Sequence, residues 1–136
     1  MRLKKSLAAY VPCPCGTDKT YALCCGVWHQ GVTQGLYAPT AEALMRSRYS
    51  AYVLNTPEYL LATWHGSTTP GALDLPIVKW VDLQVCQAHE TGEAGVVEFI
   101  ACYRLDGVCK RLHEISRFVC QEDRWWYIDG VESVGD

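Results

Sequence analysis

Residues 96–120 read VVEFIACYRLDGVCKRLHEISRFVC, and this stretch decides the fold that we expect. Apolar and polar residues alternate on both sides of Asp106-Gly107, a pair typical of a two-residue turn between antiparallel strands. With the turn at these two residues, alternate positions of the two strands share one face. That face should be covered by helices and collects Val97, Phe99, Ala101, Tyr103, Leu112, Glu114, Ser116, Phe118 and Cys120.

Two more strand patterns and two helical patterns accompany this hairpin. The four expected strands cover residues 78–88, 96–105, 111–120 and 125–128. The helical patterns cover residues 41–53, with Thr40 as N-cap, and 58–64, introduced by Thr56-Pro57. Helices followed by a meander of strands predict an α+β domain in which helices pack on an antiparallel sheet.

The last turn, expected at Glu122-Asp123, assigns the remaining side chains to the two faces of the sheet. It adds Trp125, Tyr127 and Asp129 to the covered face. The opposite face carries both polar and apolar side chains, so we expect it to face water or a second copy of the chain. Its residues are Glu98, Cys102, Arg104, His113, Ile115 and Arg117. A homodimer through this outer face is therefore one expectation.

Charged residues on the two apolar surfaces are the candidates for a functional pocket. Helical spacing puts Arg48 on the same stripe as Leu44 and Met45, with Arg46 on the opposite side. A buried guanidinium needs a partner, so we predict an ionic contact from Arg48 to Glu114. The alternative is an unpaired Glu114 whose pKa is raised by burial, suited to acid–base chemistry. No catalytic residue is assigned; the candidates for an enzyme are Glu114, His65, Arg48, Ser116 and Asp129.

Four cysteines gather near the start of the chain as C-x-C, eight intervening residues and then C-C. Cys13, Cys15, Cys24 and Cys25 offer the four thiolates that a closed structural zinc site requires, so we predict one structural zinc ion. A pair of disulfides or free thiols is the alternative, although adjacent cysteines bridge each other only with strain. His29 is either a substitute ligand or a neighbour of the site. The remaining cysteines are expected to be small buried hydrophobic residues: Cys86, Cys102, Cys109 and Cys120.

Composition excludes several classes of function. Apolar residues make up 49% and charged residues 20% of the 136 residues, as in a globular protein, and the net charge is −3. This charge gives no reason to expect nucleic acid or an anionic membrane as a partner. The apolar run at residues 7–11 is too short for a signal peptide. We therefore expect a cytoplasmic protein.

Two resemblances to known families rest on specific motifs. Cys13-Pro14-Cys15-Gly16, followed by Tyr21 and Cys24-Cys25-Gly26, resembles the SEC-C zinc motif, which would occupy residues 10–31. The segments LMRSRYSAY (44–52), TWH (63–65), EISRF (114–118) and WYIDG (126–130) resemble the bacterial YchJ-like family, also called UPF0225. This second resemblance implies a nuclear transport factor 2-like domain over residues 32–136, a cone with a curved sheet over helices. The family is largely uncharacterised.

Two functions of different classes follow. The first is an adaptor that contacts a protein or the ribosome through the zinc motif, with Lys19, Tyr21, Trp28 and His29 at the contact. The second is a small pocket enzyme of the isomerase, dehydratase or cyclase type, which the resemblance to the cone fold suggests. On either interpretation the zinc is structural, because four protein ligands leave no position for water. An open pocket with an unpaired Glu114 would favour the enzyme, whereas an Arg48–Glu114 pair in a closed core would favour the adaptor.

Overall fold

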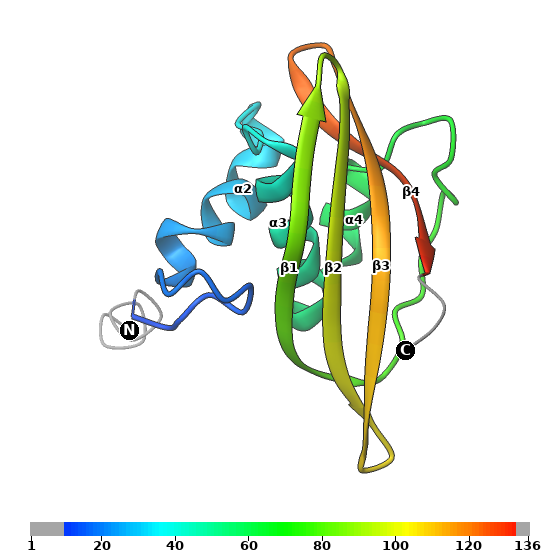
Figure 1. The fold of residues 1–136 in the computed structure, drawn as a ribbon. Coiled ribbons are helices and arrows are strands. Elements are labelled where there is room, and N and C mark those ends of the chain that lie inside the picture. The colour runs from blue at the N-terminus through cyan, green and yellow to red at the C-terminus, as the bar shows by residue number, and fades with distance from the viewer. Residues whose placement is uncertain (1–9, 133–136) are drawn as a thin grey trace.

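Four long strands form an antiparallel meander, in order β1 (Lys79–Thr91), β2 (Ala94–Leu105), β3 (Val108–Gln121) and β4 (Arg124–Glu132). The computed structural model describes residues 10–132. Helices α3 (Ala41–Leu54) and α4 (Pro57–Ala62) lie against one face of the sheet, and the segment with the cysteines lies to the side, next to α3 (Figure 1). The architecture confirms the predicted α+β class.

The central hairpin has the predicted register. Asp106 and Gly107 have φ of +52° and +79°, both in the left-handed region that a two-residue turn needs. Phe99 lies opposite Glu114, and Val97 lies opposite Ser116. The predicted covered face of this hairpin is therefore the face toward the helices.

The strands are longer than the expected ranges 78–88, 96–105, 111–120 and 125–128. Their turns are tight, with Thr91 paired to Ala94 and Gln121 paired to Arg124. Glu122 and Asp123, which form the last turn, also have positive φ values of +57° and +63°. Each turn thus has only two residues, and the strands continue right up to it.

One register prediction is wrong, at Asp129. Arg117 pairs with Asp129, but Phe118 pairs with Tyr127, so Ile128 is an extra residue and β4 carries a β-bulge. The bulge leaves Tyr127 on the face toward the helices and turns Asp129 to the outer face, beside Arg117. Its physical reason lies outside the sheet: the Tyr127 backbone also pairs with residues 63–65, which a pattern within the strand does not show.

The helices agree with their sequence signals at the start and differ at the ends. In α3 the Thr40 hydroxyl accepts a hydrogen bond from the Ala43 N–H at 3.0 Å, as an N-cap should. Helix α4 ends at Ala62, not at Trp64, because Trp64 forms a parallel bridge with Tyr127. Thr56 precedes α4 but makes no side-chain cap; its hydroxyl donates to the Ala51 carbonyl at 3.3 Å.

The cysteine segment contains a helix that we did not predict. A short 3₁₀ turn, η1 (Tyr21–Leu23), leads into α2 (Cys25–Gly31) and a second 3₁₀ turn, η2 (Val32–Gln34). Gly31 fits tightly against Leu36, since a Cβ at this position would lie 2.7 Å from the Leu36 Cβ.

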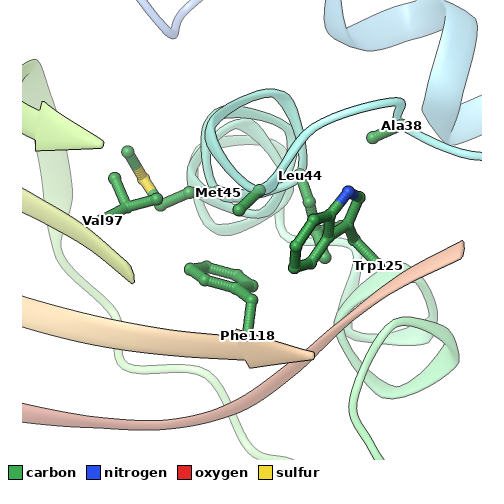
Figure 2. Packing of buried hydrophobic residues seen from close by; sticks show 7 residues of the cluster. Ala38, Leu44, Met45, Val97, Phe118 and Trp125 are labelled. Carbon is green, nitrogen blue, oxygen red and sulfur yellow. The ribbon is translucent and has the colours of Figure 1, made fainter. Parts of the chain in front are cut away.

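The main core lies between α3 and the sheet. Leu44 and Met45 of α3 point toward Val97, Phe118 and Trp125 of the sheet (Figure 2). No helix within the described residues is long and apolar enough to cross a membrane.

Candidate functional site

The four cysteine sulfurs of residues 13–25 come together at one point. Cys13 and Cys15 are supplied by a tight turn, Cys24 follows η1, and Cys25 begins α2. All four sulfurs lie within 4.8 Å of one another, and the Cys15 and Cys24 sulfurs are 3.6 Å apart. None of the four is in a disulfide. Three are buried, so the cluster has the donor set and the enclosure of a metal site.

The thiols of Cys13, Cys15 and Cys25 do not titrate independently. Hydrogen bonds from Cys15 and Cys25 lower the pKa of Cys13 well below its ordinary value. The hydrogen bond to Cys13 in turn raises the pKa of Cys25. Ionisation of one thiol thus makes ionisation of its neighbours harder, as expected for like charges at close range. A divalent cation would remove this conflict by accepting all the sulfurs as thiolates.

The cysteine segment is packed against the cone. Cys13, Cys15 and Cys25 share one apolar cluster with Tyr49 of α3 and Ala101 of β2. Arg46, expected on the side of α3 away from the core, donates from Nη1 to the Cys15 carbonyl at 2.8 Å. It also pairs with Glu42 one turn earlier. The face of α3 that we expected to point to solvent is therefore covered by the cysteine segment.

His29 joins the same interface and uses both ring nitrogens there. Nε2 lies 2.7 Å from the Ser47 carbonyl and Nδ1 lies 2.7 Å from the Tyr21 hydroxyl. Because a carbonyl only accepts, Nε2 donates and Nδ1 accepts from Tyr21. The two hydrogen bonds occupy the nitrogens that a metal would need. His29 is therefore a neighbour of the cysteine cluster and not a substitute ligand.

The expected contact surface of an adaptor is largely used internally. Tyr21 and His29 are engaged with each other, and Trp28 packs against two apolar clusters of the cone. Of the four expected contact residues, Lys19 alone is exposed, and the other three are half-buried. The segment does expose other apolar side chains, among them Tyr10 at 78% and Leu23 at 75%.

A cavity of about 310 Å³ lies between α3 and the sheet. Its walls are mostly aromatic and aliphatic, and three polar side chains from our candidate list line it, namely Arg48, Glu114 and Ser116. The other lining residues are Met45, Tyr49, Tyr52, Pro76, Trp80, Phe99, Ala101, Leu112, Phe118 and Tyr127. The predominance of apolar walls with a few polar groups is the usual character of a ligand site.

Arg48 is buried at this cavity without a carboxylate partner. Its Nη1 donates to the Leu60 carbonyl at 2.8 Å and to the Thr63 hydroxyl at 2.7 Å. The guanidinium lies 4.0 Å from the ring centre of Tyr127 and 5.0 Å from that of Trp64. Burial lowers the pKa of Arg48 to about 10, so the group stays charged at neutral pH.

The predicted Arg48–Glu114 ion pair is therefore wrong. Both residues lie in the described part of the chain, and no ion pair joins them. Glu114 instead accepts a hydrogen bond from the Ser116 hydroxyl at 2.7 Å. Its carboxylate also packs directly against Gly130, where a Cβ would collide with it. Two aromatic rings, one carbonyl and a threonine hydroxyl take the place that we had assigned to the carboxylate.

The other two candidate residues lie outside the cavity. His65 bonds to Ser67 and to Gln121, holding the loop after α4 against the last hairpin. Asp129 lies on the outer face, where it accepts two hydrogen bonds from Arg117 at 2.7 and 2.6 Å. These bonds lower the pKa of Asp129. Both residues are structural contacts.

Sequence reasoning missed the aromatic walls contributed by Tyr49 and Trp80. Tyr49 lies next to the stripe of α3 that we predicted to be buried. The buried part of α3 is wider than this stripe, because Tyr49 is buried as well. Trp80 pairs with Tyr103 across β1 and β2. Because Trp80 is the cross-strand partner of Tyr103, it lies on the same covered face of the sheet.

The expectation that the other four cysteines are buried is wrong for two of them. Cys86 and Cys109 are exposed on the strands, and Cys102 and Cys120 are half-buried.

The burial of His29 predicts a pH effect on stability. Burial lowers the pKa of His29 below its ordinary 6.5. The unfolded chain therefore takes up this proton at higher pH than the folded protein, and the stability from the neutral imidazole is present above pH 6.5 and is lost as the pH falls. We expect the loss of unfolding free energy between pH 7.5 and 5.5, measured with urea, to be smaller in His29→Gln than in the wild type. An equal loss in both proteins would contradict the assignment.

Comparison with known proteins agrees with this geometry. A family model described as the YchJ middle NTF2-like domain matches residues 40–130, and a SEC-C motif matches residues 11–26. The chain is 47% identical over 131 residues to a UPF0225 protein of Bordetella pertussis, covering 94% of this chain and 98% of that protein. It is 51% identical over 125 residues to a UPF0225 protein of Methylibium petroleiphilum, covering 90% and 89%.

Two solved structures share the whole fold. A SEC-C motif containing protein from Rhodopseudomonas palustris superposes with a TM-score of 0.78 at 33% identity, covering 90% of this chain and 99% of that one. A second, from Psychrobacter arcticus, has a TM-score of 0.79 at 29% identity, covering 96% and 87%. From the match to the middle domain and the identity to full-length relatives, the chain belongs to the YchJ-like UPF0225 family.

Proposed function

We propose that the protein binds a small organic acid in the cavity of its cone and that the four cysteines hold a structural zinc ion. The observation that carries the first part is Arg48, a buried cation that faces the cavity without a carboxylate partner. A charge in such a place is costly unless an anion compensates it. Among the described residues only Nη1 donates hydrogen bonds, so Nε and Nη2 have no hydrogen-bond acceptor there. They are free to bind an anionic group.

The second polar group of the cavity restricts the ligand further. The Glu114 carboxylate accepts from Ser116 and retains further acceptor capacity. A molecule with an anionic group for Arg48 and a hydroxyl or amine for Glu114 would satisfy both. The aromatic walls favour an apolar body between these groups. At about 310 Å³ the cavity is at the small end of ligand sites, which favours a small metabolite over a cofactor.

The same arrangement supports acid–base chemistry as an extension of binding. The Ser116 hydroxyl and the Glu114 carboxylate form a hydrogen-bonded pair at the cavity wall. Such a pair can accept a proton from a bound molecule. An isomerase or dehydratase is therefore the enzyme class that this site would suit, with zinc remaining structural in the other segment.

An adaptor role is the second candidate, favoured by the exposed apolar side chains of the cysteine segment. Tyr10, Val11 and Leu23 are large, apolar and exposed. Protein surfaces that bind partners often carry such residues. The contact would then use these side chains with Lys19, and not the packed Tyr21, Trp28 and His29.

Either role requires reduced thiols for the metal site, which is why we place the protein in the cytoplasm.

Replacing Arg48 tests the ligand proposal. Small hydroxy, amino and aromatic carboxylic acids are screened by ligand-observed NMR, and the Kd of each bound acid is measured by calorimetry. A hydrogen-bonded charge contributes about 1.5–3 kcal/mol, so Arg48→Met should weaken binding roughly tenfold to hundredfold. Arg111→Met, which removes an exposed arginine away from the cavity, is the matched control and should leave the Kd unchanged.

A second variant keeps this test decisive if Arg48→Met does not fold. Glu114→Gln removes the carboxylate that would accept from the hydroxyl or amine of the ligand, so a hydroxy or amino acid should bind less tightly, whereas an acid without such a group should bind unchanged or more tightly. If the acid binds outside the cavity, neither variant should change its Kd. Failure of every acid to bind the wild type, or unchanged binding in folded Arg48→Met, would contradict the proposal.

Replacing Cys24 tests the zinc proposal. A serine hydroxyl does not supply the thiolate that the metal requires. After a chelator wash that removes exchangeable metal, we expect one zinc ion per chain in the wild type and none in Cys24→Ser, measured by atomic absorption. Cys109→Ser, in which an exposed cysteine outside the cluster is replaced, should retain the ion. Stoichiometric zinc in Cys24→Ser would contradict the four-thiolate site.

A further inference from the structure

A second group of potential metal ligands lies on the outer face of the sheet, away from both sites described above. Cys86 of β1, Glu98 of β2 and His113 of β3 come from three adjacent strands. Their ligand atoms all lie within 4.8 Å of one another. The group shares no residue with the four-cysteine cluster or the cavity.

A β-bulge in β1 brings the thiol to this group. Val85 pairs with Phe99 and Gln87 pairs with Glu98, so Cys86 is an extra residue in the strand. Cys86 and Gln87 therefore both lie opposite Glu98, a two-to-one arrangement that a regular strand does not provide. Bulges commonly re-aim a side chain beside a functional site.

The carboxylate at the centre of the group is already oriented. Gln87 donates to one oxygen of Glu98 at 3.4 Å, and His113 Nε2 lies 2.7 Å from the other. His89 lies 2.9 Å from the Gln87 amide oxygen and so fixes the amide in turn. Hydrogen bonds of this kind orient the ligands of a metal site.

We propose that Cys86, Glu98 and His113 form a second, exchangeable zinc site. Thiolate, imidazole and carboxylate are the three donor types that zinc accepts, and three protein ligands leave the fourth position to water. Ligand atoms around a tetrahedral zinc lie about 3.3–3.8 Å apart, so small side-chain rotations within the present group suffice. Zinc would bind Cys86 as the thiolate and His113 as the neutral imidazole, so that binding releases the proton of the Cys86 thiol.

The open fourth position distinguishes this site from the four-cysteine cluster. Three protein ligands, one of them exposed, hold a metal less tightly than four thiolates in a buried turn. A chelator should therefore remove this ion first. The proposal is independent of the function assigned to the cavity and of the identity of the ion in the cluster.

The test counts zinc ions on the intact chain. Chelator-washed protein is titrated with Zn²⁺ alone, and bound ions are counted by native mass spectrometry. We expect the wild type to take up one ion more than Cys86→Ser and one more than Glu98→Gln. Cys109→Ser, which also removes an exposed cysteine from a strand, should behave as the wild type. Circular dichroism verifies that the variants fold.

A spectroscopic measurement identifies the thiolate directly. With Co²⁺ added to chelator-washed protein, whose four-cysteine cluster keeps its ion, the first equivalent should give a thiolate-to-cobalt charge-transfer band in the wild type and in Cys109→Ser, and none in Cys86→Ser. Equal metal uptake by the wild type and folded Cys86→Ser, or bound cobalt without the thiolate band in the wild type, would overturn the proposal.

Discussion

The buried guanidinium of Arg48 is the constraint on which the arrangement of the cone depends. It joins the end of α4 to α3 through the Leu60 carbonyl and the Thr63 hydroxyl, and it stacks on rings of Trp64 and Tyr127. The same segment then pairs with β4, since the Tyr127 N–H donates to the Thr63 carbonyl and the His65 N–H donates to the Tyr127 carbonyl. Helix, loop and last strand thus meet around one charge. Because two rings, one carbonyl and a hydroxyl hold this charge, Glu114 is left on the wall formed by the sheet and a cavity remains.

The cysteine segment and the cone form one packed unit. Arg46 and the backbone of Ser47 on α3 hold the segment through Cys15 and His29, while Arg48 on the same helix lies at the cavity. A metal ion bound by the four cysteines would therefore have a structural role in the cone, because its loss would disturb the segment that packs on α3.

The sequence was informative where interactions are local. The Asp106-Gly107 turn fixed the register of Phe99 against Glu114, Thr40 marked the start of α3, and the spacing of the four cysteines placed them in one cluster. It failed where a distant segment decides the outcome. The bulge at Ile128, which turns Asp129 outward, accompanies the pairing of Tyr127 with residues 63–65. The aromatic partners of Arg48 come from two elements that are far apart in sequence, so helical spacing placed Arg48 inside but did not identify what surrounds it.

A double-mutant cycle between Arg48 and Glu114 tests the central claim most directly. Unfolding free energies from urea denaturation are compared for the wild type, Arg48→Met, Glu114→Gln and the double variant. If Arg48 is held by the two rings, the Leu60 carbonyl and the Thr63 hydroxyl and leaves the cavity open, the coupling free energy should be below about 1 kcal/mol. A coupling of about 3–5 kcal/mol, the cost of breaking a buried ion pair, would contradict the account, because the two charges would then neutralise each other.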